Sequence, residues 1–122
     1  MLVLLFAGCS PNIVGTWNID RYEVDNYKGQ NVSSTNAGEI VVNKNGTGEK
    51  NLFYTMLNED HKDEQSFRWD LKDNILRIYD TKGKGNSNFA KSWIVVTDKG
   101  KKQVWKSTDG NNSVQIIELR KQ

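Results

Sequence analysis

The chain has 122 residues, of which 36% are hydrophobic and 26% charged, with a formal net charge of +2. This is the size of one domain with one core, and 17 Lys+Arg against 15 Asp+Glu argues against a nucleic-acid partner. One Cys and one His exclude an intramolecular disulfide framework and a zinc site made only of Cys and His. We therefore expect no metal and no cofactor.

The first ten residues, MLVLLFAGCS, are an apolar run followed by small residues, which is typical of a secretory signal. Ala7-Gly8 directly before Cys9 resembles the lipobox of bacterial lipoproteins. The resemblance implies that residues 1–8 are a signal remnant, that Cys9 carries the lipid and that residues 9–12 form a tether. Ser10 then implies the periplasm-facing side of an outer membrane. The alternative is a buried strand with a chance cysteine.

Strand patterns dominate after residue 12, because few windows have helical periodicity. Gly15–Val24 is the first expected strand. Trp17 and Ile19 would lie on one face, and Tyr22 and Val24 on the other unless a bulge intervenes. The polar stretch Asp25–Ala37 predicts a loop. Asn45-Gly46 predicts a type I′ turn between two further strands, Glu39–Lys44 and Thr47–Met56.

The charged stretch Leu57–Asp63 predicts a second loop, and Gln65–Lys72 alternates cleanly between apolar and polar residues. Asp73-Asn74 is expected to form a tight turn, and Thr81–Asn88 a loop. The remaining expected strands are Ile75–Asp80, Phe89–Val96, Lys102–Ser107 and Val114–Leu119. Eight consecutive antiparallel strands form either a sandwich or a barrel, and the local pattern does not choose between them.

Gly15-Thr16-Trp17, at the start of the first expected strand, resembles the G-x-W signature of lipocalins and the wider calycin group. The loop at Asp25–Ala37, the turn Asn45-Gly46-Thr47-Gly48 and the strand with Phe67-Arg68-Trp69 agree with it. Together they resemble the small lipocalin-like domain of bacterial lipoproteins. The resemblance implies an all-β, eight-stranded antiparallel up-and-down barrel over residues 13–122.

In lipocalins the signature Trp packs across the closed end of the barrel near an Arg from the end of the last strand. The resemblance therefore implies that Gly15, Trp17 and Arg120 close the barrel here, with Arg120 over the indole. It also makes Asp25–Ala37 a loop that partly covers the open end. Because the chain is shorter than most lipocalins, we expect a small or filled interior.

Aromatic side chains are the candidate ligand contacts, because pockets in barrels are lined by apolar and aromatic groups with a few polar ones. For any single ring, core packing is the alternative. The candidate ligand-binding residues are Tyr54, Phe67, Trp69 and Trp93. Catalysis lacks support, since His61 falls in a charged predicted loop and no G-x-S-x-G elbow or P-loop ending occurs.

These observations favour a non-enzymatic, lipid-anchored envelope protein whose barrel binds a small hydrophobic or amphipathic ligand. The alternative is a filled barrel that contacts an envelope protein partner or inhibits an enzyme. A third possibility, a single-strand nucleic-acid binder, is disfavoured by the eight strands, the near-neutral charge and the export signal. A void of several hundred Å³ would favour the first function, and a packed core with an exposed apolar patch the second.

Overall fold

The computed structural model describes residues 12–26, 31–56, 58–80, 89–108 and 113–122. The predicted signal, Cys9 and most of the tether lie outside these residues. The described residues contain eight strands: β1 (Gly15–Asn26), β2 (Asn31–Val42), β3 (Thr47–Met56), β4 (Glu59–Lys72), β5 (Ile75–Asp80), β6 (Ser92–Lys99), β7 (Lys102–Thr108) and β8 (Ser113–Lys121).

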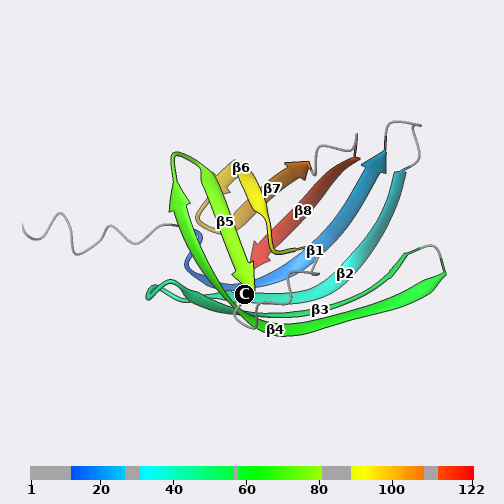
Figure 1. The fold of residues 1–122 in the computed structure, drawn as a ribbon, viewed down its shortest axis with the longest axis horizontal. Coiled ribbons are helices and arrows are strands. Elements are labelled where there is room, and N and C mark those ends of the chain that lie inside the picture. Colours follow the sequence, from blue (N-terminus) through cyan, green and yellow to red (C-terminus); the bar gives the residue numbers. More distant parts are fainter. Residues whose placement is uncertain (1–11, 27–30, 57, 81–88, 109–112) are drawn as a thin grey trace, which may run out of the picture.

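The eight strands form a closed barrel in which each strand pairs antiparallel with the next in sequence and β8 returns to β1 (Figure 1). The up-and-down barrel predicted from the sequence is therefore confirmed, and the sandwich is excluded. In the described part of the chain, no helix is long and apolar enough to cross a membrane.

A bulge in β1 decides which side chains enter the barrel. Ile19 faces Leu119 across the ladder and Arg21 faces Glu118, so Asp20 is an extra residue on β1. Ile19 and Tyr22 lie three positions apart, yet both are buried, and the extra residue allows both side chains to face the interior. Without a bulge, the two-residue alternation of a strand would put these two side chains on opposite faces. The bulge allowed for in the sequence analysis is therefore present.

The prediction of a loop over Asp25–Ala37 is wrong for most of that segment, because β2 already begins at Asn31, which pairs with Asp25 on β1. The first half of β2 is rich in Ser, Thr and Asn and mostly exposed. It therefore lacks the apolar alternation that indicates a strand. Asn36 has a φ of 53° and Gly38 of 118°, and this irregularity further hides the element. A covering loop spanning this whole segment therefore does not exist.

The predicted loop Leu57–Asp63 is also mostly strand, since β4 begins at Glu59 and pairs with the end of β3. A φ of 64° at Asn58 lets the chain reverse there. The β3–β4 hairpin extends beyond its neighbours (Figure 1), because β2 pairs with β3 only as far as Leu52 and β5 pairs with β4 only from Phe67. Many side chains of such a hairpin face water, so charged residues occur where a loop was expected.

The turn at Asn45-Gly46 is not of type I′, because only Gly46 has a positive φ. The Asn45 side chain instead accepts hydrogen bonds from the Thr47 backbone N–H at 3.1 Å and hydroxyl at 2.6 Å, a local arrangement that Asn favours in turns. The two consecutive positive φ angles of a type I′ turn occur at Asp73 (52°) and Asn74 (67°).

Three fully buried indoles, those of Trp17, Trp93 and Trp105, form a large part of the core. Trp17 Nε1 donates a hydrogen bond to the Ile13 carbonyl at 2.8 Å, and Trp93 Nε1 donates to the Phe89 carbonyl at 2.9 Å. These two indoles therefore each anchor the segment four residues before them. We call the end of the barrel where β1 begins, next to Trp17, the closed end.

Phe89 is not part of a strand, since β6 begins only at Ser92. Its ring nevertheless lies inside the barrel, 3% exposed, with its centroid 6.2 Å from that of Phe67. Phe67 in turn packs against Gly48 on the facing strand, where a Cβ atom would overlap the ring. Glycine at this position thus makes room for the aromatic core.

Candidate functional site at the open end of the barrel

The opposite end of the barrel, which we call the open end, has a polar interior. Lys50 on β3 points inward and its side chain has no exposed area, and its Nζ lies 2.9 Å from Oδ2 of Asp63 on β4. The same Nζ lies 5.3 Å from the ring centroid of Phe89. Burying a charge is costly unless it is paired, so the ion pair accounts for the presence of Lys50 in the barrel.

Aromatic rings surround this pair. Tyr22 meets Tyr54 edge to face with centroids 5.0 Å apart, and Tyr54 stacks on His61 at 5.0 Å with an interplanar angle of 17°. Burial raises the pKa of the Tyr22 hydroxyl, and the neighbouring Tyr54 and Asp63 raise it further. Tyr22 thus remains a neutral hydrogen-bond donor. His61, expected in a solvated loop, is half-buried on β4.

A cavity of about 20 Å³ lies between these groups. Its lining combines apolar walls with two hydroxyls and one carboxylate: Ile19, Tyr22, Ala37, Leu52, Tyr54, Asp63, Phe89 and Ile117. A volume of this size holds about one water molecule. Among the described residues, the interior beside these groups is therefore largely filled, in agreement with the small or filled interior expected from the sequence.

A second inward polar contact lies on the other side of the open end. Lys91 Nζ donates a hydrogen bond to Oε1 of Gln115 on β8 and sits 5.7 Å from the ring centroid of Trp93. Gln115 is buried. Amine, amide, phenol and carboxylate groups thus face the interior at the open end, while the closed end holds indoles and aliphatic side chains together with the buried amide of Gln103, which accepts a hydrogen bond from Trp105 Nε1 at 3.1 Å.

The structure brings together only some of the predicted ligand contacts. Tyr54 lines the cavity. Phe67 and Trp93 are core residues, 1% and 0% exposed, and their rings pack against the ring of Phe89. Trp69 lies away from the cavity, where its Nε1 donates to the carbonyls of Asn43 and Thr47 at 3.0 Å and fixes the β2–β3 turn.

Lys50 and Asp63 were missed by the sequence analysis. Lys50 lies between Gly48 and Leu52, and all three are buried. Strict alternation of inward and outward side chains along β3 would therefore have predicted that Lys50 faces the interior. Asp63 could not be predicted in this way, because it belongs to the stretch expected to be a loop.

The complete burial of Trp17 agrees with its predicted place at the closed end. Gly15 leaves room for the side chain of Lys121, which a Cβ atom at this position would overlap. The predicted role of Arg120 is wrong. Its exposed guanidinium pairs with Asp20 at 3.1 Å, whereas Lys121 places its Nζ 5.4 Å from the Trp17 ring centroid. Leu119 is buried, so alternation along β8 directs Arg120 outward and Lys121 inward.

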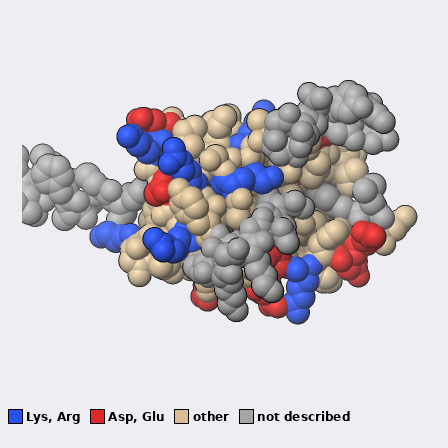
Figure 2. Space-filling view, in the orientation of Figure 1, with Lys and Arg blue, Asp and Glu red and all other residues tan. Residues whose placement is uncertain are grey.

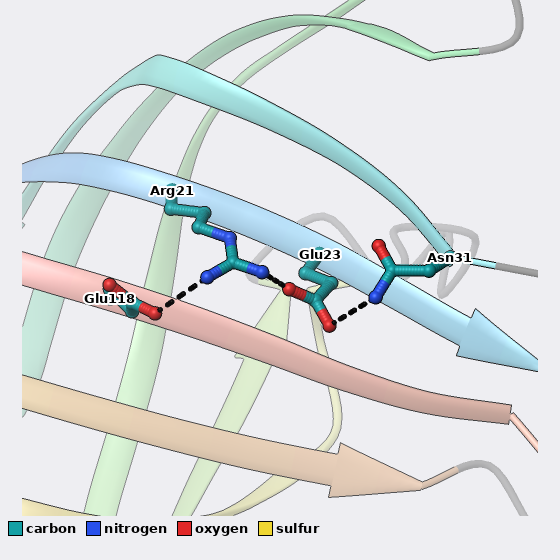
Figure 3. Close-up of polar contacts among 4 residues, drawn as sticks. All are labelled: Arg21, Glu23, Asn31 and Glu118. Atoms are coloured by element: carbon teal, nitrogen blue, oxygen red, sulfur yellow. Dashed lines mark hydrogen bonds and ion pairs between the residues drawn. The ribbon is translucent and has the colours of Figure 1, made fainter.

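A polar network lies on the outer face of the barrel beside the β1 bulge (Figure 3). Arg21 contacts Glu23 and Glu118, the latter at 3.3 Å, and Asn31 donates to Glu23 at 2.9 Å. The network joins β8, β1 and β2, which gives it a structural role. Within the described ranges, no group of three or more His, Cys, Asp or Glu could hold a metal ion.

A closed eight-stranded up-and-down barrel with one indole-packed end and one polar end defines a small antiparallel barrel of the calycin type. The chain belongs to the family of lipocalin-like domains, whose model matches residues 13–121. A search of curated proteins finds no match.

Two solved structures show the same fold. A lipocalin-like protein from Bacteroides uniformis superposes with a TM-score of 0.59 at 12% identity, covering 91% of this chain and 99% of that chain. Japanin from Rhipicephalus appendiculatus, bound to cholesterol, gives a TM-score of 0.51 at 10% identity and covers 93% of this chain and 78% of that chain. At these identities the similarity concerns the fold alone.

Proposed function

We propose that the protein is a lipid-anchored, non-enzymatic envelope protein whose barrel binds a small amphipathic molecule at its open end. The observation that carries the proposal is the inward-facing polar cluster of Lys50, Asp63, Tyr22 and Tyr54 in an otherwise apolar interior. An apolar core would be at least as stable as a buried ion pair. Apolar walls with a few convergent polar groups are the usual composition of a small-molecule site.

The cavity limits the class of ligand. A volume of about 20 Å³ accepts only a small polar head group, which would meet Tyr54 and Asp63. The apolar part of the molecule would lie against Leu52 and Phe89 toward the open end. That Japanin, of the same fold, is bound to cholesterol supports an apolar ligand class, while the filled interior favours a molecule much smaller than a sterol.

The proposed location rests on the first residues of the chain. Ala7-Gly8-Cys9-Ser10 resembles a lipobox, and we propose attachment of lipid at Cys9 and residence on the periplasm-facing side of the outer membrane. Acyl chains bury about 0.8 kcal/mol per methylene, so two or three chains anchor a domain stably. Replacing Cys9 with Ala in a bacterial host should move the protein to the soluble fraction. Retention in the membrane fraction would contradict the anchor.

Ligand binding can be tested with two variants at adjacent positions. Leu52 is buried against the cavity, while Phe53, the next residue on β3, is 58% exposed. The full chain with Cys9 replaced by Ser is titrated with 1-decanol, a neutral alcohol whose hydroxyl can donate to Asp63, and tyrosine and tryptophan fluorescence is recorded. Leu52→Phe fills the cavity and should weaken binding at least about tenfold, because overpacking a filled site is costly. Phe53→Leu should leave binding unchanged.

Native mass spectrometry of the protein purified from membranes complements the titration, since a retained small molecule would identify the natural ligand. Equal decanol affinity of both variants would place binding outside the cavity. Failure of the unmodified chain to bind decanol, together with no retained molecule, would contradict the proposed ligand class.

A second candidate is a filled barrel that acts by contacting an envelope protein. The small cavity favours it, because small-molecule pockets measure about 300–1,000 Å³ against about 20 Å³ here. Exposed Phe53 on the projecting β3–β4 hairpin offers an apolar contact. If the titration and the mass spectrum are both negative, this function is favoured, and Phe53→Ser should then reduce recovery of a crosslinked envelope protein.

A further inference from the structure

Charge is unevenly divided between the two halves of the chain. Residues 1–74 contain seven Lys or Arg and eleven Asp or Glu, whereas residues 75–122 contain ten Lys or Arg and four Asp or Glu. In an up-and-down barrel, consecutive strands occupy consecutive positions around the wall. One side of the barrel is therefore acidic and the other basic.

The closed end gathers further cations, because antiparallel pairing brings three turns and the end of β8 to it. Its exposed lysines lie on or beside the turns after β2, β4 and β6: Lys44, Lys72, Lys99, Lys101 and Lys102. Two exposed carboxylates lie among them, Asp73 in the β4–β5 turn and Asp98 near the end of β6, so the lysines outnumber the acidic residues there. We call these five lysines the closed-end lysines.

The open end has the opposite character. Glu59 and Asp60 are exposed at the tip of the β3–β4 hairpin, and Lys62 beside them pairs with Glu64 at 3.1 Å. Figure 2 shows one face: most of the blue surface lies in the left half, toward the closed end, where smaller red patches adjoin it, and a group of red lies near the right-hand end. The molecule thus has a charge difference along its long axis.

Exposed apolar side chains adjoin the closed-end lysines. Ile94 and Val96 on β6 are 52% and 53% exposed. β6 ends at Lys99 and leads directly into the turn that contains Lys101. Ile94 faces Ile75, the first residue after the β4–β5 turn. Cations beside exposed aliphatic side chains are the composition of surfaces that bind the interface of anionic membranes.

We propose that the closed end docks on an anionic phospholipid surface through the closed-end lysines, with the open end directed away from the membrane. The position of the chain's N-terminal side supports this occupant. Ile13 is buried at the closed end and Asn12 before it is exposed, so the chain enters the barrel there. Three residues span at most about 10 Å, which places a lipid on Cys9 close to the same end.

The docking goes beyond the proposed anchor and ligand, and it can be measured without either. The test uses the full chain with Cys9 replaced by Ser, so that no lipid is attached. Its binding is measured by sedimentation with vesicles of phosphatidylcholine alone and with vesicles that contain one quarter phosphatidylglycerol. Binding should increase strongly with phosphatidylglycerol and be lost at high salt, because screening weakens exposed charges.

Two single charge reversals provide the matched comparison, since each changes the net charge equally. Lys101→Glu lies in the proposed surface and Lys62→Glu at the open end, and both side chains are exposed. Each Lys near an anionic surface contributes about a fivefold factor, so Lys101→Glu should lower binding to the phosphatidylglycerol vesicles about 25-fold. Lys62→Glu should change it less than about twofold. Circular dichroism of both variants verifies the fold.

Equal losses in both variants would overturn the proposal, because overall charge and not the closed end would then govern binding. Binding that is independent of phosphatidylglycerol would overturn it as well, and would leave an acidic protein as the partner of the lysines. The apolar first residues are the same in every sample, so they cannot produce a difference between variants. Failure here leaves the Cys9 anchor and the ligand site intact, since their experiments use separate measurements.

Discussion

The two ends of this barrel contrast in what fills them. At the closed end, Trp17 and Trp105 are fully buried, and Trp17 Nε1 donates a hydrogen bond to the carbonyl of Ile13, which lies just before β1. At the open end, Lys50 and Asp63 form an ion pair next to two tyrosines. The first arrangement maximises apolar burial, whereas the second includes groups that apolar residues would replace without loss of stability. The contrast predicts that the closed end contributes more to stability, and it agrees with the ligand site that we propose at the open end.

The largest effect is expected at the closed end. Trp17→Ala removes a fully buried indole and should reduce the free energy of unfolding by about 3–5 kcal/mol. Tyr54→Ala at the open end should cost less, because Tyr54 is only half-buried. Denaturant unfolding of both variants measures the difference. A loss below about 1 kcal/mol for Trp17→Ala, or equal losses, would contradict the division between the ends.

The ion pair gives the next largest effect, and it should be asymmetric. Asp63→Asn leaves the fully buried ammonium of Lys50 without its carboxylate partner and should cost about 3 kcal/mol. Lys50→Met should cost less, since the Asp63 side chain is 19% exposed and retains contact with water. The double variant should be close to the unmodified protein in stability. Equal costs for the two single variants would show that burial does not govern the pair.

The smallest effect concerns pH. Because the pKa of Tyr22 is raised in the folded state above the unfolded value of about 10, its contribution to stability is complete below pH 10. As the pH rises above that value, the contribution is lost at about 1.4 kcal/mol per pH unit. Tyr22→Phe should therefore lessen the decline of stability above pH 10. The same slope in both proteins, followed by urea unfolding between neutral and alkaline pH, would contradict this.

The closed end could be predicted from sequence because its signals are local. Gly15-Thr16-Trp17 identified the indole, and alternation in Gln65–Lys72 identified a strand whose Phe67 is in the core. The error at Arg120 was one of register: a shift of one residue reverses which side chain faces inward, and Lys121 occupies the position over Trp17.

The open end was predicted less well, because its strands do not have an apolar face along their whole length. The first half of β2 pairs only with β1, and the beginning of β4 pairs only with β3. Both segments are polar and largely exposed, so they resemble loops in composition. Tyr54 was identified as an aromatic residue with a polar tip. The contact between Lys50 and Asp63 arises from the pairing of β3 with β4, and the register of that pairing cannot be read from a single sequence.

The single extra residue in β1 has a consequence for how this chain can vary. Upstream of Asp20, alternate side chains face the interior in one phase, and downstream they face it in the other. A deletion of Asp20 itself would leave regular alternation, in which Ile19 and Tyr22 still face the interior, because the pairing with β8 on both sides of the bulge would be kept. A deletion in β1 away from the bulge has no such compensation, and it would turn the side chains on one side of the deleted residue from the interior to solvent. The harm done by a shortened β1 therefore depends on where the residue is lost, and it is smallest at the bulge.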